Sequence, residues 1–330
     1  MTTAQPNYNP ALPTIPLPFA WEGNPMDSKG CYVNLNHPFT TSFKDVWKWQ
    51  RGPKPQKLEK QKDTWRMPVH QNPDILHSDA DAIYWLGHAC FLICINGIRF
   101  ITDPVFGAMP FIKRHTVLPV DVAELRSIDY ILLSHDHRDH CDKKSLQLLA
   151  ANNPQAKVLT SLGMEKLIRP WIGNITVREA GWFQQYATDG FTLTYLPARH
   201  WCRRGLNDIN RRLWGSFMLE MEGRSIYFGA DSGYDTHFAT IGQLFPHIDV
   251  CMIGAGAYKP SWFMSPSHTS PQEAVQAFHD LGAKTLIPMH YGTFDLSDEP
   301  MGEPARLLRQ MQQEGKGDIR LLEVGGTLLL

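Results

Sequence analysis

The sequence predicts an α/β fold in which two mixed β-sheets stack face to face and helices cover their outer faces, an αββα sandwich. The order of the expected elements is the first observation behind this prediction. Strand patterns dominate residues 82–133, strands and helices mix over residues 143–178, and strand patterns dominate again over residues 191–253. Such an order favours two packed sheets over one parallel sheet. The second observation is that 43% of the residues are hydrophobic, which is ample for a core between two sheets.

Residues 1–80 predict an N-terminal arm that packs on a domain formed by residues 81–330. Prolines recur along this stretch, which excludes long helices and central strands. The stretch also carries more large aromatic side chains than a disordered tail would have, namely Phe19, Trp21, Trp47, Trp49 and Trp65. We therefore expect an extended segment that wraps the domain and docks its aromatic side chains.

Hydrophobic periodicity and turn residues predict the elements of the domain. The first strands are expected at residues 82–86, 90–95 and 99–102, with Asn96-Gly97 as the hairpin turn between the last two. Further strands are expected at residues 128–133, 157–160, 176–178, 191–196, 213–221, 224–228, 249–253 and 285–289. Helices are expected at residues 143–151, from about residue 164, at 271–281 with a proline at the start, and at 305–313.

The most informative stretch follows the predicted strand at residues 128–133 and has the sequence Ser-His-Asp-His-Arg-Asp-His from position 134. It places four side chains of the metal-ligand type close together, namely His135, His137, Asp139 and His140. Imidazole and carboxylate groups are the usual ligands of a hydrolytic Zn²⁺, and a set without thiolate favours a catalytic site over a structural one. Alternation in an extended segment directs His135 and His137 toward one metal, while Asp139 and His140 follow a turn and can face a second metal.

The pattern HxHxDH resembles the signature of the metallo-β-lactamase superfamily, whose fold is the αββα sandwich. The resemblance implies three further ligands at strand ends, and His200, Asp231 and His290 each follow a strand-like run in the expected order. It implies two Zn²⁺ ions, one held by His135, His137 and His200 and the other by Asp139, His140 and His290, with Asp231 bridging them. Coordination lowers the pKa of a shared water toward about 7, which would supply hydroxide at neutral pH.

Two residues outside this set are expected to lie near the metals. Asp103 ends a predicted strand in the sequence Thr-Asp-Pro, and in this fold such an aspartate commonly orients a metal-bound histidine. His88, in the sequence Gly-His-Ala, is interpreted as a core histidine or as a support for a ligand rather than as a ligand itself. Ser134 is interpreted as a loop capper, because the mechanism requires no serine nucleophile.

Five further stretches narrow the resemblance. They are Trp-Leu-Gly-His-Ala at 85–89, Thr-Asp-Pro at 102–104, Pro-Ala-Arg-His-Trp-Cys at 197–202, Leu-Trp-Gly-Ser at 213–216 and Trp-Phe-Met at 262–264. Together they resemble the N-acylphosphatidylethanolamine-hydrolysing phospholipases D, and the resemblance covers roughly residues 80–295. It implies a zinc-dependent phosphodiesterase that uses a metal-bridged hydroxide. The substrate would be N-acylphosphatidylethanolamine or a related phospholipid, and the products would be phosphatidic acid and N-acylethanolamine.

The same resemblance implies roles for single residues in the reaction. Asp139 and Asp231 would act through the metals that they bind. His268 matches a histidine that this family places near the substrate, so it would contact the phosphate or protonate the leaving alkoxide. The alternative for His268 is a structural residue at the entry to the helix that begins at Pro271.

Other activities remain open for the same ligand set. A phosphosugar lactonase or a thioester hydrolase, which are small-molecule hydrolases, could use it. A nuclease would need a basic surface or an insertion that clamps RNA, and the sequence shows neither clearly. A non-catalytic binding protein would be expected to have lost one or more of the ligands, whereas all seven are present.

Composition bears on partners and location. A net charge of -1 argues against a strongly electrostatic nucleic-acid binder, so no nucleic acid is expected. The six cysteines form no CxxC pair and are expected to be free thiols in a reducing compartment. No apolar run approaches the ~20 residues of a membrane span, and the N-terminus lacks the features of a secretory signal. A cytoplasmic protein with room for peripheral membrane contact is therefore expected, and a homodimer stays open.

The loop at residues 104–115 is the expected membrane contact. It carries the apolar residues Phe106, Met109, Phe111 and Ile112 beside the cations Lys113 and Arg114. Apolar side chains next to cations suit an interfacial contact with a phospholipid surface or a lip over an apolar substrate. The alternative is that this loop packs against the N-terminal arm.

Overall fold

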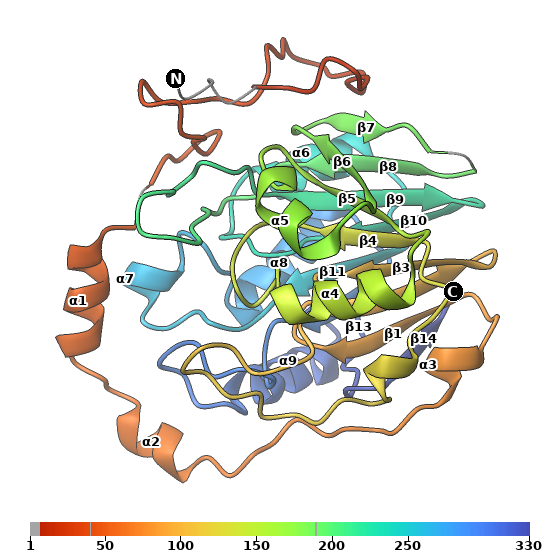
Figure 1. The fold of residues 1–330 in the computed structure, drawn as a ribbon. Coiled ribbons are helices and arrows are strands. Elements are labelled where there is room, and N and C mark those ends of the chain that lie inside the picture. Colours follow the sequence, from red (N-terminus) through yellow and green to blue (C-terminus); the bar gives the residue numbers. More distant parts are fainter. Residues whose placement is uncertain (1–6, 40, 189) are drawn as a thin grey trace.

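The computed structural model describes residues 7–39, 41–188 and 190–330, and within these residues two seven-stranded sheets stack with helices outside them (Figure 1). The predicted αββα sandwich is confirmed. One sheet has the order β14 (Thr327–Leu329), β1 (Ala82–Gly87), β2 (Cys90–Ile95), β3 (Ile98–Thr102), β4 (Tyr130–Leu133), β5 (Lys157–Ser161), β6 (Thr176–Ala180). The other has the order β13 (Asp318–Ile319), β12 (Thr285–Met289), β11 (Val250–Gly254), β10 (Arg224–Phe228), β9 (Ser216–Met221), β8 (Thr192–Leu196), β7 (Gln184–Tyr186).

The helices fall into those of the arm and those of the domain. The arm contains α1 (Phe43–Arg51), α2 (Lys57–Lys62) and α3 (Asp74–His77). The domain contains the 3₁₀ helix η1 (Val122–Glu124) and α4 (Lys143–Asn152), α5 (Glu165–Ile172), α6 (His237–Leu244), α7 (Ser261–Met264), α8 (Pro271–Leu281) and α9 (Glu303–Gln313).

Strand direction brings several loops to one edge of the second sheet. β10, β11 and β12 are parallel neighbours. β8 is antiparallel to β9, which is antiparallel to β10, so β8 and β10 run the same way. The carboxyl ends of β8, β10 and β12 therefore lie at a common edge, and the chain after each of them carries one of the predicted ligands.

Large aromatic side chains fill the core and hold the loop after β8. Trp182 and Trp214 are fully buried. The Trp182 Nε1–H donates to the Trp214 carbonyl at 2.6 Å, and the Trp214 Nε1–H donates to the Ala198 carbonyl at 3.0 Å. Each indole N–H thus has an acceptor, so the rings can be buried without an unpaired donor. The second bond also fixes the main chain two residues before His200.

Local sequence signals explain where the predictions of the elements succeed and fail. α8 has the predicted bounds, because Ser270 and Glu273 form a capping box and Pro271 stands at its first turn. β12 also has the predicted bounds. β9 begins at Ser216 rather than at residue 213, because the Leu213 N–H donates to Leu162 instead of pairing with β8. The sequence does not predict β7, β13 and β14, since strands of two or three residues carry no periodicity.

The described part of the N-terminal arm lies along the domain and contacts it through aromatic rings. Trp21 packs edge-on against Phe183 with ring centroids 4.8 Å apart, and Trp49 stacks on Phe263 at 5.2 Å. Trp47 differs, because 57% of it is exposed. Division of the chain at residue 80 stays a prediction.

The structure contradicts the expected membrane contact of the loop at residues 104–115. Phe106 and Met109 are buried, and the Arg114 guanidinium donates to the carbonyls of Leu86, Val105 and Thr116. These side chains face the domain and cannot enter a membrane. Phe111 is fully exposed. The prediction of four apolar side chains displayed together is therefore wrong.

The six cysteines are all buried and free, and their compartment stays a prediction. Among the described residues, no helix combines the length and the apolar character that crossing a membrane requires.

Candidate metal centre

Loops at the ends of four strands converge on one buried centre. β4 leads to the His135–His140 stretch, β8 to His200, β10 to Asp231 and β12 to His290. The described residues form four overlapping groups of ligand-type atoms here, and within each group the atoms lie within 4.8 Å of one another. Two of these groups together contain all seven predicted ligands. One group is His135, His137, His200 and Asp231, and the other is His88, Asp139, His140 and His290. The structure thus brings all seven predicted ligands together, and their assignment as ligands stays a prediction.

The first group has the spacing of a metal site with three imidazoles. The Nδ1 atom of His137 lies 3.0 Å from Nε2 of His135 and 3.0 Å from Nε2 of His200. Zinc–nitrogen bonds of about 2.0–2.1 Å in a tetrahedron would place neighbouring nitrogens roughly 3.3 Å apart. The Asp231 Oδ2 atom lies 3.7 Å from His200 Nε2. Three nitrogens and one oxygen therefore surround one position.

The second group shares Asp231 through its other oxygen. The Nε2 atoms of His140 and His290 each lie 3.1 Å from Asp231 Oδ1. Asp139 Oδ2 lies 3.4 Å from His290 Nε2 and 3.7 Å from His140 Nε2. Because one oxygen of Asp231 faces each group, its carboxylate is placed to bridge two cations.

Several buried polar atoms in the second group have no hydrogen-bond partner among the described residues. They include the Nε2 atoms of His140 and His290 and the Oδ1 atom of Asp231. Buried polar atoms are normally paired, so a convergent set of unpaired ones fits a bound cation. Burial lowers the pKa of His290, but the nearby Asp231 and Asp139 carboxylates together raise it more. The resulting pKa of His290 is about 9. The Asp139 and Asp231 carboxylates lie beside these nitrogens, and the donors present fit a divalent metal.

Comparisons with known proteins agree with this geometry. The family described as "Beta-lactamase superfamily domain" matches residues 98–291. The chain belongs to the metallo-β-lactamase superfamily. It is 35% identical to the N-acyl-phosphatidylethanolamine-hydrolyzing phospholipase D 1 of Caenorhabditis elegans over 263 residues, which cover 74% of each chain. It is 32% identical to the mitochondrial enzyme of that name from Saccharomyces cerevisiae, over 70% of this chain and 52% of the relative.

A solved structure shows the same fold. Igni18, a metallo hydrolase from Ignicoccus hospitalis, superposes with a TM-score of 0.58 at 18% identity, over 76% of this chain and 97% of the other. The predicted resemblance to the superfamily and to the phospholipase D relatives is confirmed. The chain is a metal-dependent hydrolase of the metallo-β-lactamase fold.

Asp103 lies where a metallo-β-lactamase-fold hydrolase needs support for its ligands. Its Oδ2 atom is 2.7 Å from His140 Nδ1, which leaves His140 Nε2 facing the centre. The Ser134 hydroxyl donates to the same carboxylate at 2.5 Å and lies 2.8 Å from His135 Nδ1. Asp103 thus supports His140 directly and His135 through Ser134. The interpretation of Ser134 as a loop capper missed this link, although its place beside the first histidine was a signal.

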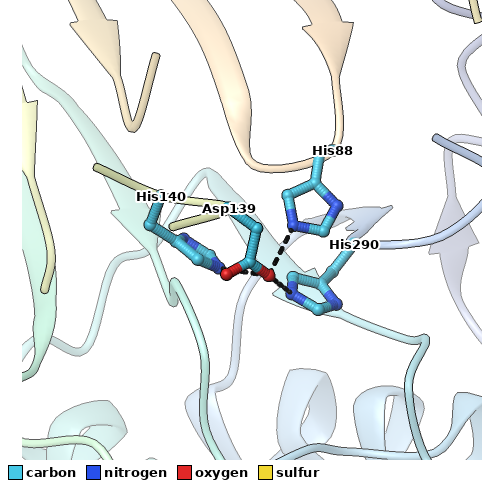
Figure 2. Close-up of side chains that lie close together, drawn as sticks. All are labelled: His88, Asp139, His140 and His290. Atoms are coloured by element: carbon cyan, nitrogen blue, oxygen red, sulfur yellow. Dashed lines mark hydrogen bonds and ion pairs between the residues drawn. The ribbon is translucent and has the colours of Figure 1, made fainter. Parts of the chain in front are cut away.

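His88 belongs to the second group, and Figure 2 shows the four side chains that converge there. Its Nε2 atom is 3.2 Å from Asp139 Oδ2, and its ring centroid is 4.0 Å from that of His290. Burial lowers the pKa of His88 to about 3, so the ring is neutral at pH 7. These contacts suit a residue that holds Asp139 in place. The interpretation of His88 as a support for a ligand, rather than as a ligand itself, stays a prediction.

His268 lies beside Asp231. Its Nδ1 atom is 3.7 Å from Asp231 Oδ2, and its ring lies 5.2 Å from that of His290. Burial lowers the pKa of His268 to about 4, so its imidazole is neutral at pH 7. The structure therefore brings His268 to the centre from the loop that precedes α8.

A cavity of about 340 Å³ opens onto the metal centre. Its polar wall consists of His137, Asp139, Asp231 and His268, and Arg138 and Arg203 also line it. Its apolar wall consists of Val46, Trp49, Trp201, Phe263, Met264 and Leu296. Val46 and Trp49 belong to α1, so the N-terminal arm forms part of this wall. Sequence reasoning missed this contribution, because nothing local links the arm to residues more than 200 positions later.

Proposed function

We propose that the chain hydrolyses N-acylphosphatidylethanolamine, or a closely related phospholipid, at the bond between the phosphate and the head group. One water molecule is consumed, and the products are phosphatidic acid and N-acylethanolamine. The observation that carries the proposal is a single cavity with a metal-binding wall and an apolar wall. Relatives at 35% and 32% identity that are named for this activity support it.

The cavity has the two surfaces that a phospholipid requires. Trp49 and Phe263 stack on each other in the apolar wall, and such a wall can cover acyl-chain methylenes at about 0.8 kcal/mol for each one buried. Three of the predicted ligands, His137, Asp139 and Asp231, line the same cavity. We propose that this centre holds two Zn²⁺ ions, which would lower the pKa of water and offset negative charge on the phosphate.

Side chains of the polar wall suit a phosphodiester. Arg138 and Arg203 line the cavity, and guanidinium groups form strong, charge-assisted hydrogen bonds to phosphate oxygens. His268 lies beside Asp231 on the same wall, where a ring nitrogen can donate to a phosphate oxygen. We assign phosphate binding to these three residues. None of them is among the seven predicted ligands.

The same proposal includes contact with a phospholipid membrane at a surface next to the cavity. We call Trp47, Lys48, Arg51 and Trp262 the α1–α7 surface. Trp47 is 57% and Trp262 is 48% exposed. The Lys48 Nζ atom lies 4.5 Å from the centroid of the Trp262 ring, and the Arg51 guanidinium lies 4.2 Å from that of Trp47. Exposed tryptophans beside cations suit the head-group region of an anionic membrane, where each cation contributes about 1 kcal/mol.

The experiment that tests the proposed function is a product analysis with a substrate panel. The panel contains N-acylphosphatidylethanolamine, phosphatidylcholine, a phosphosugar lactone, an acyl thioester and RNA. We expect N-acylethanolamine and phosphatidic acid to appear, and both to disappear in His135→Ala. Hydrolysis of the lactone or the thioester without release from any phospholipid would instead assign the chain to the small-molecule hydrolases.

A further inference from the structure

We propose that the N-terminal arm is part of the metal centre and that Asn34 is the positioning residue through which the arm holds His200. The inference rests on the proposed function in one respect, because it takes His200 to be a metal ligand. Holding His200 is a second task for the arm, separate from its contribution to the apolar wall of the cavity.

Asn34 contacts both main-chain polar groups of His200. The His200 N–H donates to Asn34 Oδ1 at 3.0 Å, and Asn34 Nδ2 donates to the His200 carbonyl at 2.9 Å. Both residues are buried, Asn34 with 3% exposed and His200 with none. A side-chain amide paired in this way with one residue's main chain fixes both its position and its direction.

His200 stands beyond the end of β8 at Leu196 and directly after the isolated bridge between Arg199 and Gly233, so no strand pairing holds its own N–H and carbonyl. The His200 ring is held separately, since its Nδ1 lies 2.9 Å from the Ser267 carbonyl and can donate to it. This bond leaves Nε2 facing His137, 3.0 Å away. The arm thus fixes the main chain of His200 while the loop before α8 fixes its ring.

Neighbouring contacts extend this attachment. The Tyr32 N–H donates to the Asn210 carbonyl at 2.9 Å. Asn210 Oδ1 in turn accepts a hydrogen bond from the Cys202 N–H at 3.0 Å. The arm is therefore tied to the chain on both sides of Trp201, a residue that lines the cavity. Metal-binding geometry tolerates displacements of only about 0.5 Å, so loss of this support should reach the metal.

A second asparagine of the arm supplies a matched control. Asn24 is also 3% exposed. Its Oδ1 accepts from the Trp182 N–H at 2.9 Å, and its Nδ2 donates to the Asn7 carbonyl at 2.6 Å. Asn24 therefore makes the same kind of buried contact, but it touches none of the predicted ligands. A purely structural role predicts similar effects for the two asparagines, whereas the proposed role predicts different ones.

The test measures metal binding to the full chain in Asn34→Ala, Asn24→Ala and His200→Ala. Zn²⁺ affinity is measured by competition with a chromophoric chelator, and Co²⁺ absorption reports the geometry of the sites. We expect Asn34→Ala to weaken one of two Zn²⁺ sites by about tenfold to a hundredfold and to change the Co²⁺ spectrum. Asn24→Ala should bind both metals as the wild-type chain does, even if it unfolds at a lower temperature.

The outcomes separate this inference from the proposed metal centre. Equal Zn²⁺ affinities for Asn34→Ala and Asn24→Ala, with a metal lost in His200→Ala, would overturn the role of Asn34 alone. Two tightly bound metals in His200→Ala would overturn the centre itself. If Asn34→Ala does not fold, Asn34→Asp keeps the acceptor for the His200 N–H and replaces the donor to the His200 carbonyl with a charged oxygen. That variant should weaken the same Zn²⁺ site, and unchanged affinity would overturn the role.

Discussion

Ser134 shows how much a single hydroxyl can control at the scale of residues. It donates to Asp103 and lies within hydrogen-bond distance of the His135 ring. In Ser134→Ala the His135 Nδ1–H would lose its acceptor, so the ring could turn away from the metal. We expect Zn²⁺ to bind about tenfold to a hundredfold more weakly, as measured by competition with a chelator.

The matched control for that prediction is Ser145→Ala. Ser145 is a buried serine that donates to Asp142 at 2.7 Å and accepts from the Phe106 N–H at 2.9 Å. It contacts none of the predicted ligands. Similar losses of Zn²⁺ affinity in both variants would show that any buried serine in this region matters equally.

His268 tests the separation of substrate contact from metal binding. It lies on the cavity wall, and it also forms a group of ligand-type side chains with Asp231 and His290, so the test has to separate the two roles. We expect His268→Ala to keep its metals and to lose about a hundredfold in turnover, the lower end of the usual range for a group that assists the reaction. His290→Ala should lose a metal. Metal content and turnover are measured for both variants. Equal metal loss in His268→Ala and His290→Ala would contradict the role of His268 in substrate contact.

At the scale of elements, α1 and α7 both line the cavity and form the exposed α1–α7 surface. One face of α1 supplies Val46 and Trp49 to the cavity, while Trp47 and Arg51 remain exposed. We expect Trp47→Gln combined with Trp262→Gln to slow hydrolysis of phospholipid in anionic vesicles at least tenfold. Hydrolysis of a short soluble phosphodiester should change little, since neither side chain lines the cavity.

The comparison variant for this prediction is Phe111→Gln. Phe111 is fully exposed on the loop that sequence reasoning favoured as the membrane contact, but its neighbours Phe106 and Met109 are buried. We expect a smaller effect on vesicles from this variant. A larger effect would return the membrane contact to that loop, and equal losses on both substrates would remove the docking role of the α1–α7 surface.

At the scale of the whole molecule, the metal centre connects the two sheets. His135, His137, Asp139 and His140 follow β4 of one sheet, whereas His200, Asp231 and His290 follow strands of the other. Metals bound between them would hold the sheets together. A ligand present at 100 times its dissociation constant adds about 2.7 kcal/mol to the free energy of unfolding.

We therefore expect chelation to lower the unfolding temperature and Zn²⁺ to restore it. Elemental analysis after Zn²⁺ replenishment should give two metals for each chain. Asp231→Asn should bind them less tightly, because the carboxylate between the two groups loses its charge. A stoichiometry that stays near one in the wild-type chain would contradict the dinuclear centre.

The sequence alone determined the sandwich fold, the position of the metal centre and all seven side chains that meet there. Each of these features has a local signal, because the ligands stand directly after apolar strands and HxHxDH places four of them in one loop. The bounds of α8 and β12 were likewise predictable from a capping box, a first-turn proline and a short apolar run.

Only the tertiary structure decided what surrounds those side chains. Asn34 and His200 are 166 positions apart, and Trp49 meets Phe263 across an even longer stretch of chain. Such contacts depend on how the arm crosses the edge of two stacked sheets, and no periodicity of a single segment records that path. The burial of Phe106 could not be predicted from the sequence either, because an apolar residue in a loop has the same sequence pattern whether it faces the core or solvent.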